Sequence, residues 1–181
     1  MRWYWIDRFL EFESGRSAAA VKNVSLAEDH LHDHFPGYPV MPGALIIEGF
    51  AQAGGILIGE SIGFTGNMIL AKVPKARFHF PARPGDTLVY RLEIEYLNDE
   101  GALVKGVSRV GERVQAEVDV FFANVMASER TRKLFSPAEL VGMAKLLGVF
   151  DVGRDKDGGK LQPPRSLAGE IVDPRRLAGR A

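Results

Sequence analysis

A histidine and a glutamate separated by fourteen positions are the side chains of this sequence best suited to acid–base chemistry. His34 lies in a loop, and Glu48 lies in the apolar segment that follows it. A titratable pair beside an apolar wall is what proton transfer requires. Prolines fix φ and glycines relax it, so we expect this loop to be rigid and sharply bent, holding the imidazole in place. The residues that shape the loop are Pro36, Gly37, Pro39, Pro42 and Gly43.

The segment after the loop predicts a long buried helix. Its apolar residues cover nearly every angle around a 3.6-residue period, which is typical of a helix enclosed on all sides. We expect the helix to run over residues 42–62, with Pro42 as a favourable first residue, and to end near Gly63. The apolar residues are Ala44, Leu45, Ile46, Ile47, Phe50, Ala51, Ala53, Ile56, Leu57 and Ile58.

Glu48 interrupts this apolar run. Gln52 lies one helical turn further on, where its amide can hydrogen-bond the carboxyl group. An ionised carboxylate without a partner is costly to bury. Glu48 is therefore a member of an ion pair with Arg77 or Arg83, a carboxyl with a raised pKa, or a residue that lines a channel.

The segments on either side of the helix predict an antiparallel sheet. Residues 9–13 and 17–24 indicate a hairpin that turns at Ser14-Gly15. Four longer strands follow the helix, over residues 67–80, 87–97, 103–110 and 113–126. A hairpin, a buried helix and a four-strand meander together predict a sheet wrapped around a helix, an α+β fold.

One of these strands alternates in polarity and should have one wet face. Its polar residues are Arg91, Glu93 and Glu95, and they alternate with Leu92, Ile94 and Tyr96.

The composition changes after this sheet, and three parts of the chain are predicted. Residues 1–128 form the main domain. Residues 129–150 form a helical extension, with a helix start at Ser136-Pro137-Ala138-Glu139. Residues 151–181 gather glycine, proline and charge, so we expect them to form a tail.

Charge and composition exclude several classes of protein. The 23 basic and 23 acidic residues cancel, so no overall field favours nucleic acid or a membrane surface. The sequence contains no cysteine, which excludes disulfides and thiolate nucleophiles and is consistent with a reducing compartment. No apolar run is long enough to span a bilayer, and charges follow the first six residues too soon for a secretory signal. We expect a cytoplasmic protein without membrane insertion.

The motifs of residues 30–88 resemble those of the 3-hydroxyacyl-acyl-carrier-protein dehydratases, a family with the hotdog fold. The first group is His34-Phe35-Pro36-Gly37, Pro39, Pro42-Gly43, Leu45, Glu48 and Ala51-Gln52. The second group is Ala71-Lys72-Val73-Pro74-Lys75-Ala76-Arg77-Phe78, Pro81 and Pro84-Gly85-Asp86. Several independent elements match in order and spacing. The resemblance implies an antiparallel sheet wrapped round a long central helix and an enzyme that removes water from 3-hydroxyacyl chains.

The resemblance also implies roles for particular residues. His34 is the base that takes the C2 proton, and Glu48 orients or protonates the departing 3-hydroxyl. The backbone N–H of Gly43, at the start of the helix, receives the thioester carbonyl. Phe35 and Gln52 are implied to contact substrate, and neither a cofactor nor a metal is needed.

Two partners follow from the same resemblance. In this family the histidine and the carboxylate of one site come from different subunits, so a homodimer or a dimer-based oligomer is implied. Acyl carrier proteins are acidic, so the docking surface should be basic. Lys72, Lys75, Arg77 and Arg83 lie in a stretch without acidic residues, although a solvated strand face explains them equally well.

Alternatives remain open at several positions. His30, His32 and His34 would point the same way in an extended segment, which is a pattern for zinc, but His30 and His32 are more simply surface residues. His79 is most simply a sheet residue. Glu48 stands where related isomerases carry aspartate, which favours plain dehydration, whereas Val40-Met41-Pro42-Gly43 is similar to the isomerase branch. A hotdog thioesterase and a non-catalytic acyl-binding subunit are the rival functions.

Overall fold

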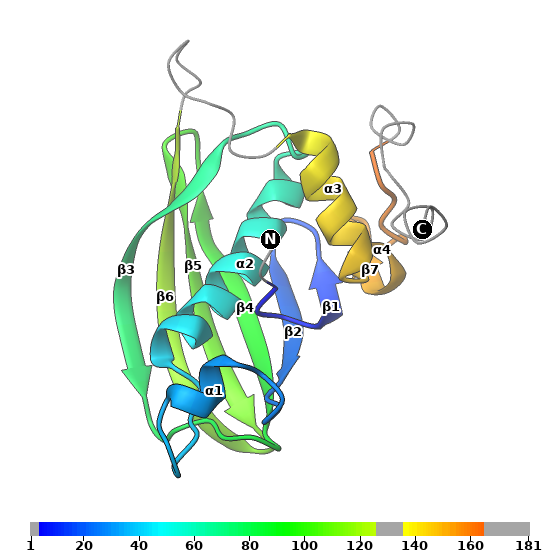
Figure 1. Cartoon of the computed structure of the whole chain (residues 1–181). Coiled ribbons are helices and arrows are strands. Elements are labelled where there is room, and N and C mark those ends of the chain that lie inside the picture. The colour runs from blue at the N-terminus through cyan, green and yellow to red at the C-terminus, as the bar shows by residue number, and fades with distance from the viewer. Residues whose placement is uncertain (1–3, 126–135, 165–181) are drawn as a thin grey trace.

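A long helix enclosed by a curved sheet is the main feature of the protein (Figure 1). The structure is a computed structural model, and it describes residues 4–125 and 136–164. The helix, α2 (Gly43–Ser61), has 19 residues, which is about 28 Å at 1.5 Å per residue. Pro42 precedes it, and Ile62 and Gly63 end it, with φ at Gly63 of 65°. The predicted helix and its ends are confirmed. No helix in these two stretches of chain is long and apolar enough to cross a bilayer.

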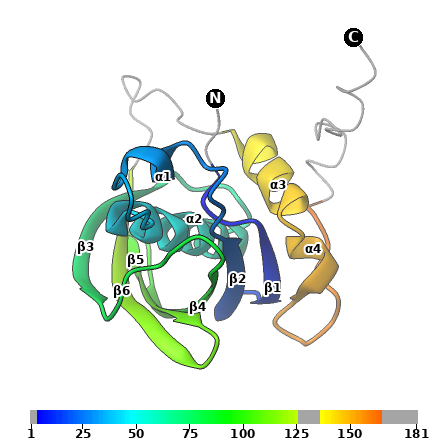
Figure 2. The same cartoon turned by 60° about the horizontal axis from the view of Figure 1, so that its bottom comes forward.

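Seven strands form one sheet in the order β3-β6-β5-β4-β2-β1-β7. Every neighbouring pair is antiparallel except β1 and β7, which are parallel. The sheet curls around α2 (Figure 2), so the predicted hotdog arrangement, hairpin and meander are confirmed. The strands are β1 (Arg8–Glu13), β2 (Ser17–Asn23), β3 (Met68–Phe78), β4 (Thr87–Leu97), β5 (Gly101–Val110), β6 (Arg113–Asn124) and β7 (Gly153–Arg154).

Aromatic rings from the helix and the sheet meet in the core between them. Phe50 of α2 and Tyr90 of β4 are fully buried, with ring centroids 4.8 Å apart and planes at 82°. This edge-to-face arrangement is favourable for aromatic pairs. Gly106 of β5 makes room for it, because a Cβ there would lie 2.5 Å from Cδ1 of Phe50. The absence of a side chain at position 106 therefore allows the helix to approach the sheet closely at this point.

The predicted alternation of β4 holds as far as Ile94 and then changes. Arg91, Glu93 and Glu95 are exposed and Leu92 is buried, as the sequence predicts. The pairing of β4 with β5 shifts register between Ile94 and Tyr96, which is a β-bulge or a similar irregularity. An extra residue at such a point turns the following side chains over. Tyr96 is therefore 44% exposed, against the expectation that it faces inward.

The polar approach to the loop, residues 26–33, contains a short helix, α1 (His30–Asp33). The sequence did not predict this turn of helix. It removes the extended geometry in which His30, His32 and His34 would share one direction.

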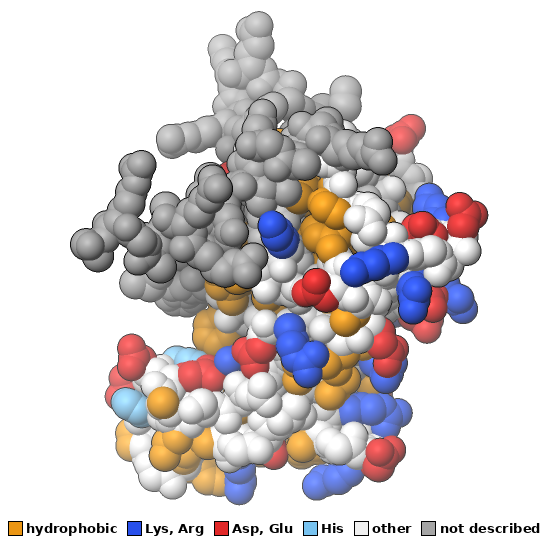
Figure 3. Space-filling view, turned by 90° about the vertical axis from the view of Figure 1, so that its right-hand side faces the viewer, with side chains coloured by type: hydrophobic (Ala, Val, Ile, Leu, Met, Phe, Trp, Pro, Cys, Tyr) orange, Lys and Arg blue, Asp and Glu red, His pale blue; other side chains and the backbone are white. Residues whose placement is uncertain are grey.

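The chain after residue 135 forms an extension against the hairpin. α3 (Pro137–Leu146) begins with a capping box between Ser136 and Glu139, which confirms the predicted helix start. α4 (Val149–Val152) follows. Figure 3 views this side of the molecule, where positive, negative and apolar side chains are mixed. The predicted boundary between residues 128 and 129 lies outside the described residues.

The prediction of a tail from residue 151 is corrected for residues 153–161. Gly153 and Arg154 form β7 beside β1, and the N–H of Ser14 donates to the Arg154 carbonyl at 2.9 Å. Leu161 is 7% exposed and belongs to the main hydrophobic core. A two-residue strand and one leucine attach this segment, although its composition is poor in apolar residues. The rest of the predicted tail, residues 165–181, lies outside the described residues.

α2 carries a second carboxyl in its last turns, Glu60, which the sequence pattern did not bring out. Its Oε2 is buried and has no hydrogen-bond partner within the described residues. Burial raises the pKa of Glu60, and a hydrogen bond from Ser14 and the positive charge of Lys156 oppose that rise. Ser14 lies in the turn between β1 and β2, and Lys156 follows β7. Glu60 therefore connects the end of α2 with both the hairpin and the extension.

We predict that Leu161→Ala lowers the free energy of unfolding by about 2–3 kcal/mol, because it removes a buried side chain and leaves a cavity. The matched control is Leu146→Ala in α3, whose side chain is 53% exposed and should cost less than about 0.5 kcal/mol. Urea unfolding at one fixed protein concentration measures both. Equal midpoints for the two variants would contradict the attachment of residues 153–161.

Candidate active site

His34 is held by its own loop. Its Nδ1 lies 2.9 Å from the carbonyl oxygen of Val40, and the N–H of Val40 donates back to the His34 carbonyl at 2.9 Å. A carbonyl oxygen only accepts, so Nδ1 carries the proton. The neutral ring then has its lone pair on Nε2. This is the arrangement expected of a general base whose orientation is fixed by its other nitrogen.

The turn that follows His34 is closed by two backbone hydrogen bonds between Phe35 and Tyr38. Gly37 has a φ of 74° there, and the peptide bond between His34 and Phe35 is cis. The ring of Phe35 stacks on the imidazole, with centroids 4.1 Å apart. Arg83 covers the Tyr38 ring and donates to its hydroxyl. The loop is therefore sharply bent and closed by hydrogen bonds between its own residues, and the bend agrees with the prediction from its prolines and glycines.

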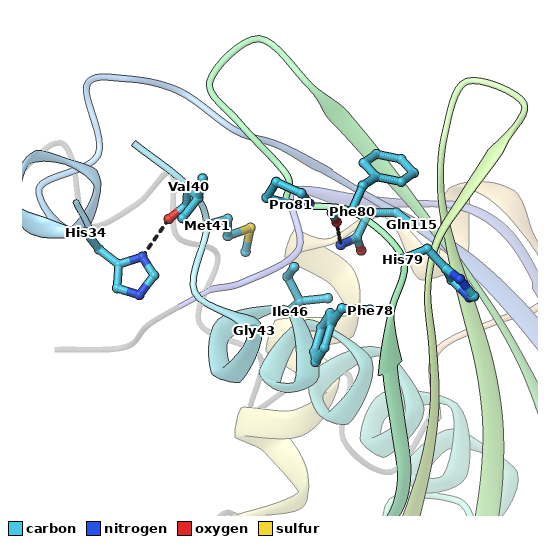
Figure 4. A pocket seen from close by; sticks show the side chains of 10 residues that line it. All are labelled: His34, Val40, Met41, Gly43, Ile46, Phe78, His79, Phe80, Pro81 and Gln115. Atoms are coloured by element: carbon cyan, nitrogen blue, oxygen red, sulfur yellow. Dashed lines mark hydrogen bonds between the residues drawn. The ribbon is translucent and has the colours of Figure 1, made fainter. Parts of the chain in front are cut away.

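His34 opens on a pocket of about 420 Å³ at the start of α2 (Figure 4). Most of its lining is apolar. The polar contributions come from His34, His79 and Gln115. The ring of His79 points away from the pocket in Figure 4 and lies 3.0 Å from Glu117 Oε1. The lining residues are His34, Val40, Met41, Gly43, Ile46, Phe78, His79, Phe80, Pro81 and Gln115.

Gly43 places the N-terminus of α2 in this pocket. It is the first residue of the helix, and Pro42 before it supplies no capping side chain. The first N–H groups of a helix lack partners within it and lie at its positive end. Phe78 packs over this point, since a Cβ on Gly43 would lie 3.0 Å from Cζ of Phe78. Glycine is needed here for the ring to approach the helix.

Glu48 is oriented by Gln52, as predicted, but lies outside the pocket. Gln52 Nε2 donates to Glu48 Oε1 at 2.9 Å, and Gln52 Oε1 accepts the backbone N–H of Trp5 at 2.8 Å. The Trp5 N–H can only donate, so it fixes which end of the amide faces Glu48. Neither Arg77 nor Arg83 forms an ion pair with Glu48 within the described residues.

The structure thus brings together only part of the predicted site. His34 and Gly43 line one pocket, whereas Glu48 and Gln52 lie elsewhere on α2, and Phe35 contacts His34 from outside the lining. The pattern missed Gln115. The pairing of β5 with β6 shifts register at this point: Ser108 pairs with Ala116 and Arg109 pairs with Val114, so Gln115 is an extra residue between them. Ala116 is buried, and simple alternation would therefore place the adjacent Gln115 on the outer face, but it is buried as well.

The three neighbouring histidines have separate surroundings. The ring of His30 packs edge-on against Trp5, and its Nε2 lies 3.7 Å from Glu28. His32 Nε2 bonds the Leu26 carbonyl at 3.1 Å. Within residues 4–125 and 136–164, no cluster of three or more histidine, aspartate or glutamate side chains could hold a metal ion.

Comparison with known families decides the relationship. The model of the FabA-like domain matches residues 3–118. The chain belongs to the FabA-like family. Proteins named 3-hydroxyacyl-acyl-carrier-protein dehydratase FabZ are similar to it. That of Desulforamulus reducens is 44% identical over 121 residues, which cover 65% of this chain and 84% of that protein. That of Pelotomaculum thermopropionicum is 41% identical over 119 residues, covering 65% and 85%. The predicted resemblance is confirmed.

Solved structures share the fold at low sequence identity. The dehydratase heterocomplex ApeI:P from Xenorhabdus doucetiae aligns with a TM-score of 0.57 and 15% identity, over 67% of this chain and 83% of that one. A hypothetical thioesterase with coenzyme A from Streptococcus pneumoniae aligns with a TM-score of 0.53 and 10% identity, over 65% and 84%. These likenesses show the fold alone. The FabA-like match ends before the extension of residues 136–161.

We predict that the neutral imidazole of His34 carries its proton on Nδ1. Free histidine prefers the other tautomer, but the Val40 carbonyl accepts from Nδ1. Nitrogen-15 NMR of histidine-labelled protein in alkaline buffer distinguishes the two ring nitrogens, and the spectrum of His34→Gln assigns the signal. A proton found on Nε2 would contradict the proposed orientation of the base.

Proposed function

We propose that this protein removes water from (3R)-3-hydroxyacyl chains carried on acyl carrier protein and yields trans-2-enoyl chains, as a hydro-lyase of fatty acid or related acyl-chain synthesis. One observation carries the proposal. An imidazole whose Nε2 has no hydrogen-bond partner among residues 4–125 and 136–164 shares one apolar pocket with the N-terminus of a buried helix. Membership of the FabA-like family and the names of the FabZ relatives support the same chemistry.

We propose the following steps for the reaction. The thioester carbonyl accepts the N–H of Gly43, which stabilises the negative charge that develops on its oxygen. Nε2 of His34 takes the C2 proton. The C3–O bond then breaks, and the departing hydroxyl takes a proton from the Glu48 carboxyl and leaves as water. The apolar lining excludes solvent, which strengthens each of these electrostatic interactions. No cofactor takes part.

We propose that two copies of the chain share each site, so that the carboxyl comes from Glu48 of the partner subunit. Glu48 lies outside the pocket of its own chain. Among the described strands β3 lies at the edge and pairs with β6 alone, and its Leu70 and Phe78 are 39% and 41% exposed. An exposed edge with apolar side chains favours pairing with another strand. Leu45 and Ile47 of the neighbouring α2 are only half-buried in one chain, although the pattern predicts a helix enclosed on all sides.

We propose that the acidic carrier protein docks near the pocket on basic side chains of β3 and the following turn. The structure modifies the predicted set. Lys75 is paired with Glu117, and hydrogen bonds from Lys75 and His79 lower the pKa of that carboxyl. Arg77 has no acidic partner in the described part of the chain, and Lys72 lies over the ring of Phe121. Lys72, Arg77 and Arg83 therefore remain as the docking charges. An acyl-carrier substrate and the absence of cysteine fit a cytoplasmic enzyme.

We predict that His34→Ala and Glu48→Gln each lower kcat/KM by about 10²–10⁴-fold in folded protein, because each removes one acid–base group. The two groups act in one step, so the double variant should lose less than the product of the single losses. Absorbance of the enoyl thioester measures turnover, and a thiol reagent detects hydrolysis in the same cuvette.

The matched control for these variants is His32→Ala, which removes a neighbouring imidazole outside the pocket lining. It should keep near-normal turnover. Full activity in His34→Ala or Glu48→Gln would remove that residue from the mechanism. Free thiol without enoyl product would instead identify a thioesterase, and neither product would identify a binding subunit.

We predict that mixing inactive His34→Ala and Glu48→Gln subunits restores part of the activity. A mixed dimer owns one intact site, made from His34 of one chain and Glu48 of the other. Mass spectrometry of isotopically labelled subunits confirms that exchange has taken place. Exchange without recovery would mean that each chain builds its own site.

A further inference from the structure

Gln115 places an amide in a pocket whose other walls are mostly apolar. It lies on β6, is 1% exposed, and lines the pocket together with Phe78, Phe80 and Pro81. Figure 4 shows it at the end of the pocket opposite His34. Neither the general base nor the carbonyl donor of the proposed mechanism requires a polar group at that end.

Two hydrogen bonds fix the orientation of this amide. Nε2 of Gln115 donates to the carbonyl oxygen of Phe80 at 2.8 Å, and Oε1 accepts the hydroxyl of Ser108 at 2.7 Å. The Phe80 carbonyl cannot donate, so the nitrogen must face it. Ser108 is fully buried and belongs to the neighbouring strand β5. The amide group is therefore held at the pocket wall by one protein partner at its nitrogen and one at its oxygen.

One N–H of this amide remains without an acceptor. The NH₂ group has two hydrogens, and the Phe80 carbonyl takes one of them. In the described part of the chain, no acceptor bonds the other. A buried donor without a partner is unfavourable. Water can pair with it while the pocket is empty, but a saturated alkyl chain that displaced this water would leave the donor unpaired.

We propose that Gln115 is a specificity-determining residue, which donates its second N–H to an oxygen atom on the acyl chain. The preferred substrates are then 3-hydroxyacyl thioesters with an ether, keto or hydroxyl oxygen beyond C4, and plain alkyl chains of the same length are poorer substrates. The inference rests on the proposed dehydration and adds the chemical class of the chain.

A purely structural role for Gln115 makes a different prediction. Its backbone carbonyl also accepts the N–H of His79 at 2.8 Å, so the residue clamps the segment from His79 to Phe80 twice. A clamp alone would affect all substrates alike when it is weakened. A donor to the acyl chain would affect only the chains that carry an oxygen. The ratio of two substrates measured on one protein separates these roles, because losses of folding or of general activity cancel.

The test uses a series of 3-hydroxyacyl N-acetylcysteamine thioesters of octanoyl length. One member is all-carbon, and in the others an ether oxygen replaces a single methylene group beyond C4. We expect kcat/KM of the wild type for the best ether to exceed that for the alkyl parent by about 5- to 100-fold, the range of one unpaired buried donor. Gln115→Leu should abolish this ratio. Ser108→Ala, which keeps the amide, should retain most of it despite lower stability.

Each other outcome has a defined meaning. A wild type without preference for any ether, or a preference that persists in Gln115→Leu, would overturn the inference. If no thioester is turned over, dissociation constants of the same series are compared by calorimetry. An ether preference in binding that Gln115→Leu abolishes would then support Gln115 while the proposed dehydration fails. Binding without that preference, or no binding at all, would overturn the role of Gln115.

Discussion

The packing of α2 against the concave face of the sheet positions the helical part of the candidate site. The helix must lie close to β5 for Phe50 to reach Tyr90, and Gly106 permits that approach. Once the helix is fixed there, its first turn faces the pocket at Gly43. A helix N-terminus brings unpaired N–H groups and a positive dipole end, so this single packing contact also supplies the electrostatics of the pocket.

The two side chains of the proposed acid–base pair are held in different ways. His34 depends on a local backbone contact, since the Val40 carbonyl is only six residues away and fixes the tautomer. Glu48 depends on a longer connection through Gln52 to the backbone N–H of Trp5, which is 47 residues from Gln52 in the sequence. The base is thus set by loop conformation, whereas the carboxyl is set by the docking of the N-terminal segment on α2.

The sequence predicted what strong and regular patterns encode. The apolar period of α2, the turn residues of the hairpin and the Glu48–Gln52 spacing each determine local structure, and all three appear in the structure. The shifts of register that expose Tyr96 and bury Gln115 leave no such trace, because alternation assumes an uninterrupted ladder. The sequence did not predict the burial of Leu161 for another reason: a short segment attached by a two-residue strand and one buried side chain has no periodicity to detect. The separation of His34 from Glu48 within one chain depends on tertiary structure, which spacing alone does not report.

The two edges of the sheet differ in how far other segments of the chain cover them. At one end, the extension occupies β1: the N–H of Phe9 donates to the Leu147 carbonyl, and the N–H of Ser14 donates to the Arg154 carbonyl. At the other end, no described strand covers the outer side of β3. In the described part of the chain, β3 is therefore the long edge that is open to pairing with another strand. In the proposed dimer, two sheets joined through β3 would leave the short strand β7 as the outer edge of each described chain, and a two-residue strand offers little backbone for a further sheet to pair with.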